Sequence, residues 1–287
     1  MEQNSTKTNI NWYPGHMAKA KREIKEKLDL IDIVYEVIDA RMPLSSRIID
    51  LDDLIKDKKK IIVVTKYDLC DVTKTNKIIN KLKETNEVVI LDLKKASRSV
   101  LNELINKTNN MLSYINDSRI KKGLKPRVYR ALVIGAPNVG KSTLINRISG
   151  KNSLKTGNRA GVTKGISWVR ISNTIELMDT PGILYPKIEN NQVGLTLASL
   201  ASINEDILNK EEIATFIIEF LYYNYPNILC DRYKLDKDTE FDLEKIFNSI
   251  AINTHSLKKG NVPDLDRVYI IIINDLKEGR IKNITFD

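Results

Sequence analysis

The stretch "GAPNVGKS", from Gly135 to Ser142, decides the fold of this 287-residue chain. It fits the pattern G-x-x-x-x-G-K-[ST], and it lies between "ALVIG", which predicts a strand, and "KSTLINRISG", which has helical spacing. In this context the glycines let backbone N–H groups close around phosphate oxygens, and Lys141 places a positive charge beside the β- and γ-phosphates. The sequence therefore predicts a nucleotide phosphate loop rather than a structural glycine turn. The predicted nucleotide contacts in this loop are Pro137, Asn138, Val139, Gly140, Lys141, Ser142 and Thr143.

Apolar runs that predict buried strands occur on both sides of this loop and alternate with helical patterns. They are "IDIVYEVID", "KKKIIVVT", "NEVVIL" and "TIELMD", and a polar loop, "DARMPLSSR", is expected after the first. Such alternation is typical of an α/β fold with a parallel sheet, whose ligands bind beyond the carboxyl ends of the strands. From about Asn190 the pattern becomes mainly helical. We therefore expect a P-loop NTPase domain over residues 1–189 and a smaller, mainly helical domain over residues 190–287. Within the first domain, a loop that contains His16 is expected to precede a basic helix over about residues 18–28.

The composition limits the class of protein and its partners. A net charge of +9 and a pI near 9.3 favour a polyanionic partner. Two cysteines, Cys70 and Cys230, supply neither a disulfide framework nor zinc-ligand spacing. The polar N-terminus lacks an apolar signal region, and the longest aliphatic runs, such as Ile270–Ile273, are far too short to span a bilayer. We expect a cytoplasmic protein that does not enter the membrane.

A second motif, "DTPG", follows the last predicted strand, downstream of the phosphate loop. The carboxylate of Asp179 can hold Mg²⁺, usually through water, and the N–H of Gly182 can sense the γ-phosphate. Between the two motifs, "NRAGVTKG" places Thr163 where a switch threonine gives its hydroxyl and carbonyl to Mg²⁺. Together with the hydroxyl of Ser142, these residues form a predicted magnesium site. The alternative for Thr163 is an ordinary Gly-Thr turn.

The motif "TKYD", from Thr65 to Asp68, ends a predicted buried strand far upstream of the phosphate loop. It resembles the N/T-K-x-D motif with which GTPases read guanine. Asp68 can accept hydrogen bonds from N1–H and the 2-amino group of guanine, which adenine lacks, so ATP would leave a buried carboxylate poorly paired. The aliphatic stem of Lys66 can lie over the base. Four letters alone also fit a solvated charged turn, but the preceding strand and the phosphate loop favour a guanine site.

The order of these motifs is unusual, because a GTPase normally carries its phosphate loop first and its guanine motif later. The strand order still works if the old ends are joined and a new cut follows D-x-x-G, since domain termini often lie close together. The basic segment "RIKKGLKPRVYR", Arg119–Arg130, is then the exposed connector. The third guanine loop is expected in "DLKKASRS", where Leu93 and Lys94 are the candidate contacts. The sequence thus predicts a circularly permuted GTPase topology.

As a set, these stretches resemble the circularly permuted ribosome-assembly GTPases, in particular the bacterial ribosome biogenesis GTPase A family. The matching segments are "WYPGHMAKA", "LIDIVYEVIDAR", "TKYD", "RALVIGAPNVGKSTLINR", "AGVTKG" and "LMDTPGILYPK", which cover most of residues 11–190. The resemblance implies that the chain binds GTP, GDP and Mg²⁺ and contacts the large ribosomal subunit and its rRNA. It also implies GTP hydrolysis coupled to late maturation of that subunit and to release of the factor. The sequence departs from the family pattern at Thr65, where Asn is commoner, and in the third guanine loop.

The source of catalysis is a separate question, because many GTPases place a glutamine directly after D-x-x-G to orient the attacking water. Here that position is Ile183, so another group must act or the intrinsic rate must be slow. In the family that the chain resembles, His16 is a candidate once a partner docks. The alternative is that His16 and the aromatics Trp12 and Tyr13 stack on rRNA bases. The resemblance also implies a K⁺ ion at Asn138, for which the alternative is a turn-forming asparagine.

Three functions are compatible with these motifs. The leading hypothesis is a GTP-driven assembly factor, stimulated by ribosomal subunits, that acts as a monomer and contacts no DNA. The second is a free-standing NTPase acting on a small molecule, for which the sequence shows no extra catalytic cluster. The third is an RNA-binding protein in which the nucleotide is a structural or regulatory ligand. Because the segment after "DTPG" leads directly into the C-terminal helices, we expect the nucleotide state to set the orientation of that domain.

Overall fold

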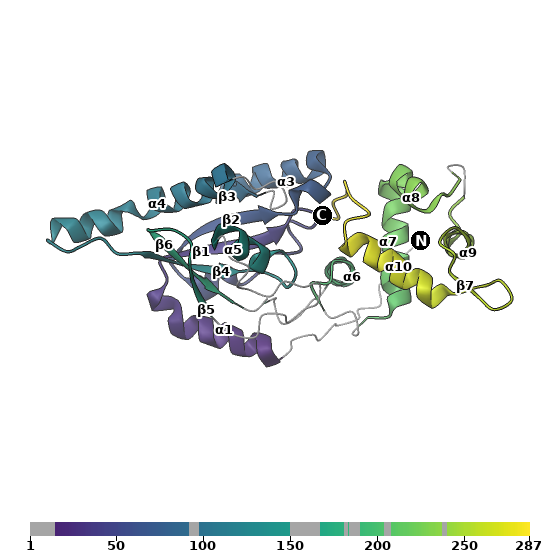
Figure 1. Ribbon diagram of the computed structural model, residues 1–287, viewed down its shortest axis with the longest axis horizontal. Coiled ribbons are helices and arrows are strands. Elements are labelled where there is room, and N and C mark those ends of the chain that lie inside the picture. Colours follow the sequence, from purple (N-terminus) through teal and green to yellow (C-terminus); the bar gives the residue numbers. More distant parts are fainter. Residues whose placement is uncertain are drawn as a thin grey trace.

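Within the described part of the chain, six strands form one mixed sheet in the order β3-β2-β1-β4-β6-β5 (Figure 1). Neighbouring strands run parallel except for the edge strand β5, which is antiparallel to β6. The strands are β1 (Ile33–Asp39), β2 (Lys59–Thr65), β3 (Glu87–Ile90), β4 (Tyr129–Ile134), β5 (Ser167–Arg170) and β6 (Ile175–Asp179). This computed structural model describes residues 15–91, 98–149, 167–180, 183, 190–203, 208–236 and 240–287.

The centre of the sheet is buried on both faces. All seven residues of β1 are buried, including the carboxylates of Glu36 and Asp39. Continuous β-branched runs suit parallel strands that helices cover on both sides. The register pairs Asp39 with Thr65 and Glu36 with Ile134, so β1, β2 and β4 end at one common edge. The polar motifs of the sequence therefore meet at this carboxyl edge.

Helices cover the two faces of the sheet. Helices α4 (Arg98–Lys121) and α5 (Lys141–Ser149) share a hydrophobic cluster with the odd-numbered residues of β1, such as Tyr35. The opposite face packs against α1 (Gly15–Lys27), α2 (Leu51–Ile55) and α3 (Val72–Lys83). This arrangement is the three-layer architecture that alternating strands and helices predict.

The direction of helix α1 follows from its packing on the sheet. Its apolar stripe, which continues into the short 3-10 helix η1 (Leu28–Leu30), consists of Ala20, Ile24 and Leu28 and packs beside β4 and β6. The spacing of four residues puts these side chains on one helix face. Because only a short link joins η1 to β1, α1 runs opposite to β1 and its first turn lies toward the carboxyl edge (Figure 1).

A helical lobe lies beyond this edge and contains α6 to α10 (Figure 1). Its helices are α6 (Asn191–Ser199), α7 (Lys210–Asn224), α8 (Pro226–Tyr233), α9 (Leu243–Asn253) and α10 (Leu265–Lys277), with a small hairpin of β7 (Leu257–Lys258) and β8 (Val262–Pro263). Asn209, Asp242 and Asp264 accept hydrogen bonds from backbone N–H groups in the first turns of α7, α9 and α10. Such caps satisfy donors that a helix start leaves unpaired.

The 281–287 segment returns from the helical lobe to the sheet. Its Asn283 N–H donates to the Leu69 carbonyl at 2.7 Å, and its Phe286 N–H donates to the Arg41 carbonyl at 2.8 Å. The Thr285 hydroxyl, fully buried, accepts from the Asp71 N–H at 3.1 Å. The lobe is thus attached to the loops that follow β1 and β2.

The expected α/β sheet and its permuted topology are confirmed. Strand β4, which carries the phosphate loop, lies between β6, which carries "DTPG", and β1. Strand β2, which carries "TKYD", is the next strand beyond β1. The guanine motif thus precedes the phosphate loop in the chain, whereas in the sheet β1 lies between its strand, β2, and the strand of the phosphate loop, β4. This is the arrangement expected when the original termini of a GTPase are joined and the chain is cut after D-x-x-G.

Several local expectations need correction. Helix α4 continues to Lys121, into the predicted connector, because no glycine or proline interrupts it before Gly123 at φ 72°. The stretch "DARMPLSSR" does form the expected loop after β1, but this loop is largely buried, with Arg41 only 1% exposed. Helix α1 begins at Gly15, so His16 belongs to a helix rather than to a preceding loop. Within the ranges that the structure describes, none of the helices combines the length and apolar character needed to cross a bilayer.

Candidate nucleotide site

The predicted phosphate loop connects β4 to α5 at the carboxyl edge, and two of its glycines have geometric reasons to be there. A Cβ at Gly135 would lie 2.3 Å from the carbonyl oxygen of Val37 on the neighbouring strand. Gly140 has φ +103°, which L side chains rarely adopt, and a Cβ there would lie 3.3 Å from the Thr65 hydroxyl. The loop is therefore packed against β1 and β2, the strands that precede it in the chain.

Lys141 lies inside this loop. Its ammonium donates to the carbonyls of Gly135 at 2.9 Å and Ala136 at 2.7 Å, and the residue is 7% exposed. Ser142 and Thr143 follow in the first turn of α5, half-buried and exposed respectively. A helix N-terminus, a lysine ammonium and a serine hydroxyl are the groups that bind phosphate and its metal ion.

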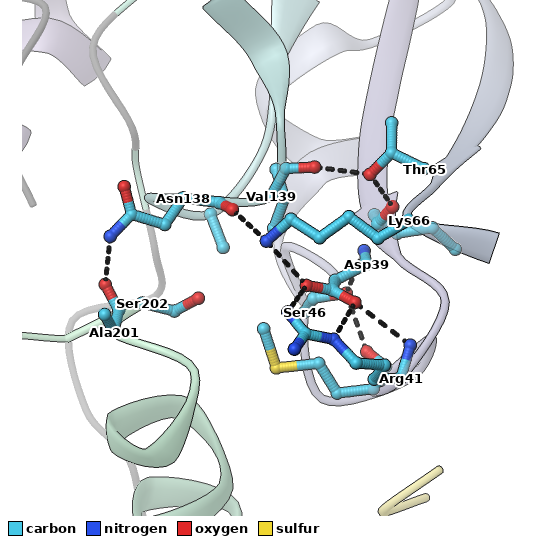
Figure 2. A network of polar contacts seen from close by, with 12 residues as sticks. Asp39, Arg41, Ser46, Thr65, Lys66, Asn138, Val139, Ala201 and Ser202 are labelled. Atoms are coloured by element: carbon cyan, nitrogen blue, oxygen red, sulfur yellow. Dashed lines mark hydrogen bonds and ion pairs between the residues drawn. The ribbon is translucent and has the colours of Figure 1, made fainter. Parts of the chain in front are cut away.

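The guanine motif "TKYD" contacts the phosphate loop directly (Figure 2). The Thr65 hydroxyl lies between two backbone carbonyls, those of Ile38 at 3.0 Å and of Val139. The ammonium of Lys66 donates to the carbonyl of Asn138. The structure therefore brings Thr65 and Lys66 together with the predicted loop residues Asn138, Val139 and Gly140. Although Thr65 replaces the commoner asparagine, its hydroxyl still ties the base motif to the phosphate loop.

A buried charge cluster that the sequence analysis missed supports Lys66. The Asp39 carboxylate lies 2.9 Å from the Lys66 ammonium and 2.8 Å from the guanidinium of Arg41 (Figure 2). Burial opposes ionisation of Asp39, but Arg41 and Lys66 outweigh it and hold the pKa of this carboxyl well below its usual range. Burial lowers the pKa of Lys66, although Asp39 opposes the change. The sequence held one signal of this cluster, because "DAR" lies at the carboxyl end of a buried strand, as the other motifs do.

Asp68 lies two residues beyond Lys66, in the short 3-10 helix η2 (Tyr67–Leu69). It is half-buried, and its negative charge is one of the influences on Lys66. Lys66 itself has φ 54°, a left-handed conformation that turns the chain sharply after β2. Lys66 and Asp68 thus follow the end of β2, where a base-reading loop belongs in such a sheet.

The segment after β6 shows why catalysis needs another group. The hydroxyl of Thr180 donates to the Val133 carbonyl at 2.8 Å, and the N–H of Ile183 donates to the Gly135 carbonyl at 3.1 Å. The Ile183 side chain is 1% exposed and packs in the cluster beneath α1. It therefore points into the core and cannot orient water.

The remaining predicted site residues are only partly described. Asp179 ends β6 beside β4, but the position of its side chain lies outside the description. His16 is the second residue of α1, and its side chain is likewise outside it. The other predicted positions, Leu93, Lys94, Thr163 and Gly182, lie outside the described residues.

The phosphate loop also contacts the helical lobe. The side-chain amide of Asn138 donates to the Ala201 carbonyl at 2.7 Å (Figure 2). The Ser202 hydroxyl donates to the Pro137 carbonyl at 2.8 Å. Both contacts use the turn after α6. Two hydrogen bonds therefore join the phosphate loop to this turn.

Comparisons with known sequences find GTPases that are similar to this chain. A family model described as "50S ribosome-binding GTPase" matches residues 130–240. The "Ribosome biogenesis GTPase A" of Bacillus cereus is 40% identical over 97% of this chain and 93% of its own length. The protein of the same name from Thermotoga maritima is 31% identical, with 97% and 94% covered.

Two solved structures resemble the fold of this chain over most of its length. A GDP-bound structure described as "TM YlqF" has 28% sequence identity and a TM-score of 0.66, covering 93% of this chain and 98% of the other. The structure described as GNP-bound YlqF from T. maritima has a TM-score of 0.65, again at 28% identity, covering 94% and 97%. The similarity therefore extends over the sheet and the helical lobe.

Proposed function

This chain belongs to the ribosome biogenesis GTPase A family, and on that premise we propose that it is a GTP hydrolase acting in assembly of the large ribosomal subunit. It binds the subunit precursor, and hydrolysis is coupled to late maturation and to its own release. The observation that carries this proposal is the junction of "TKYD" with the phosphate loop, formed by Thr65 with Val139 and by Lys66 with Asn138. One nucleotide can contact both motifs there.

The donor set fits a guanosine di- or triphosphate. Lys141, the first turn of α5 and the backbone from Asn138 to Gly140 supply positive charge and N–H donors for phosphate. Asp68 supplies the acceptor that distinguishes guanine from adenine, and the stem of Lys66 covers the base. We assign further base contacts to Leu93 and Lys94, and a γ-phosphate contact to Gly182, from their positions in the sequence.

Mg²⁺ belongs to this proposal through Ser142, Thr163 and Asp179, whose oxygen atoms are the ligand type it prefers. The ion would neutralise charge between the β- and γ-phosphates. We also propose K⁺ near Asn138, whose oxygen-bearing side chain stands on the phosphate loop at φ 59°. Comparing hydrolysis rates in K⁺ and Na⁺ buffers tests this ion, and equal rates would contradict it.

His16 is the proposed catalytic residue. Because Ile183 is buried, the group that orients water has to come from elsewhere, and α1 carries His16 toward the carboxyl edge. A positioned general base contributes about 10²–10⁴ in rate. Single-turnover hydrolysis by His16→Ala in the presence of large subunits is expected to slow by about this factor, with subunit binding retained. Normal stimulated hydrolysis would instead assign His16 to rRNA contact.

The partner in this proposal is the rRNA of the large subunit. Lys121, Lys122 and Lys125 are exposed at the end of α4, whereas Arg127 and Arg130 are paired with Asp32 and Glu176. Exposed lysines bind phosphates at the expense of counterions, so binding should weaken steeply as salt rises. We propose a monomeric cytoplasmic factor with a GTPase domain over residues 1–189 and an RNA-binding domain over residues 190–287.

Co-sedimentation with large subunits, with hydrolysis assayed in parallel, tests the function. We expect subunit binding with a non-hydrolysable GTP analogue, weaker binding with GDP, and GTP hydrolysis that is slow alone and faster with subunits. Brisk partner-free turnover without subunit binding would indicate a free-standing NTPase. Binding to subunits without hydrolysis would indicate an RNA-binding protein that uses nucleotide as a structural ligand.

A further inference from the structure

Lys66 is held in an unusual way for a long, flexible side chain. Its backbone is in the left-handed region at φ 54°, which a non-glycine residue adopts only at a cost. Its ammonium lies 2.9 Å from Asp39 Oδ2 and also donates to the Asn138 carbonyl. A lysine side chain loses considerable rotamer freedom when it is fixed, so these contacts determine where the stem lies.

Asp39 is in turn fixed by Arg41. Arg41 donates to both carboxylate oxygens, from Nε at 3.1 Å and from Nη2 at 2.8 Å, and its backbone N–H donates to Oδ1 at 3.0 Å. Asp39 is fully buried and Arg41 is 1% exposed. A bidentate pair of this kind fixes orientation as well as distance. The low pKa of Asp39 is consistent with a carboxylate that stays ionised between two cations.

Arg41 also contacts the helical lobe. Its Nη1 donates to the Leu276 carbonyl near the end of α10 at 2.9 Å, and its own carbonyl accepts from the Phe286 N–H at 2.8 Å. A continuous chain of contacts therefore runs from α10 through Arg41 and Asp39 to Lys66. Of these residues, Lys66 alone is among the predicted nucleotide contacts.

We propose that Asp39 is a positioning residue for the guanine nucleotide: together with Arg41 it fixes Lys66 over the base, at a place that the helical lobe sets. This inference rests on the proposed function, since it concerns the same nucleotide site. Asp39 touches no part of the nucleotide in this proposal and acts only through Lys66. The alternative is that Asp39 and Arg41 form a purely structural buried pair.

The test needs variants that keep the fold. Asp39→Asn alone leaves the buried guanidinium of Arg41 without its counter-ion, which is strongly destabilising. The paired substitution Asp39→Asn/Arg41→Met removes both buried charges at similar volume, a change that proteins often tolerate. The matched control is Glu36→Gln/Arg47→Met, because Glu36 is a buried carboxylate on the same strand, paired with Arg47 at 2.9 Å. Thermal melting identifies the variants that fold.

Affinity is measured by fluorescence titration with N-methylanthraniloyl-GDP and by competition with unlabelled GDP and GTP. The paired substitution is expected to raise the Kd of GDP and of GTP alike by about tenfold, the loss that one charge-assisted contact implies. Because Lys66 stands on the base side, kcat at saturating GTP is expected to change by less than about twofold, while KM rises with Kd. The control pair is expected to leave Kd unchanged.

A double-mutant cycle with Lys66→Met separates positioning from a structural role. In the Lys66→Met background, the paired substitution is expected to change Kd by less than about twofold, since residues that act in series are not additive. The same Kd increase in both backgrounds, or an unchanged Kd in the paired variant alone, would overturn the inference. A wild-type chain that binds ADP as tightly as GDP would overturn the proposed function and this inference together.

Discussion

The hydroxyl of Thr65 donates to the carbonyl of Val139, so the base motif and the phosphate loop share a hydrogen bond across 74 residues of chain. Thr65 is fully buried, and the same hydroxyl also reaches the Ile38 carbonyl. We expect Thr65→Val to leave the Val139 carbonyl unsatisfied, at a cost of about 1–3 kcal/mol in unfolding free energy. Chemical denaturation measures this cost. Thr65→Ser keeps the hydroxyl and is expected to retain most of the stability and the GDP affinity.

Asp68→Asn tests how the base is read. In the proposed site the carboxylate accepts from N1–H and the 2-amino group of guanine, whereas an asparagine amide would present a donor to one of these two donors. We expect GDP affinity to fall by at least about a hundredfold, because a lost complementary hydrogen bond leaves polar groups unpaired. Xanthosine diphosphate, which carries an oxygen in place of the 2-amino group, is expected to bind the variant better than GDP does. Competition titration against labelled GDP compares the two, and unchanged selectivity would remove Asp68 from the site.

Gly140→Ala tests the packing of the phosphate loop. Gly140 has φ +103°, and its added Cβ would lie 3.3 Å from the Thr65 hydroxyl. We expect a loss of about 1–2 kcal/mol in unfolding free energy together with weaker GDP binding. Gly123→Ala is the matched control, because Gly123 has φ +72° but nothing within 4 Å of the new Cβ. It is expected to cost stability without changing the Kd of GDP.

Asp275→Asn probes the core of the helical lobe. The buried carboxylate of Asp275 accepts from Arg232 at 2.8 Å and from the hydroxyl of Tyr233 at 3.1 Å, and Arg280 is a third partner. Removing the charge leaves Arg232 without its carboxylate partner, whereas Arg280 keeps Glu278. Both arginines are partly exposed, so we expect a loss of about 1–3 kcal/mol in unfolding free energy, the cost of leaving buried polar groups poorly paired. Urea denaturation measures this loss. Asp266→Asn, on the exposed side of the same helix, is expected to change it little.

The hydroxyl of Tyr225, at the junction of the helical lobe and the sheet, is expected to make the free energy of unfolding depend on pH. Its hydroxyl donates to Asp71 at 3.1 Å and accepts from the Thr285 N–H at 3.1 Å. Burial, with the charge of Asp71, raises the pKa of Tyr225 to about 12 from an ordinary value of 10.0. Since the neutral form is favoured in the folded state, its contribution to stability is fully present below pH 10 and is lost as pH rises toward 12.

The measurement for Tyr225 is the difference in unfolding free energy between the wild-type chain and Tyr225→Phe, followed from pH 8 to 12. Subtracting the variant removes the titration of lysines, which both chains share. We expect the difference to shrink above pH 10. A difference that stays constant across this range would show that the hydroxyl is not held in its neutral form.

The sequence predicted the sheet well because its strands are continuous apolar runs. It also predicted that "TKYD" and "GAPNVGKS" would meet, since both end parallel strands. It did not predict β5, because the four-residue stretch Ser167–Arg170 is an antiparallel edge strand whose ladder depends on β6. Short edge strands carry little periodic signal of their own.

The burial of the loop "DARMPLSSR" could not be predicted from the sequence either, because the composition of a polar loop does not show whether it is solvated or buried. Asp39 and Arg41 are buried only because each neutralises the other and because Leu276, more than 200 residues away, accepts from the guanidinium. Long-range pairs of this kind leave no local pattern. The docking of Thr285 against Asp71 is equally invisible in either segment alone.

Attachment of the 281–287 segment to Leu69, Asp71 and Arg41 has a consequence for folding kinetics. The hydrogen bond between Asp71 and Thr285 joins residues 214 positions apart, and contacts of such separation close late because loop entropy opposes them. We therefore expect the turn after β2 to gain its final partners after the helices have docked. In stopped-flow refolding, recovery of GDP binding should lag behind recovery of the sheet signal, which makes ligand competence the slowest step.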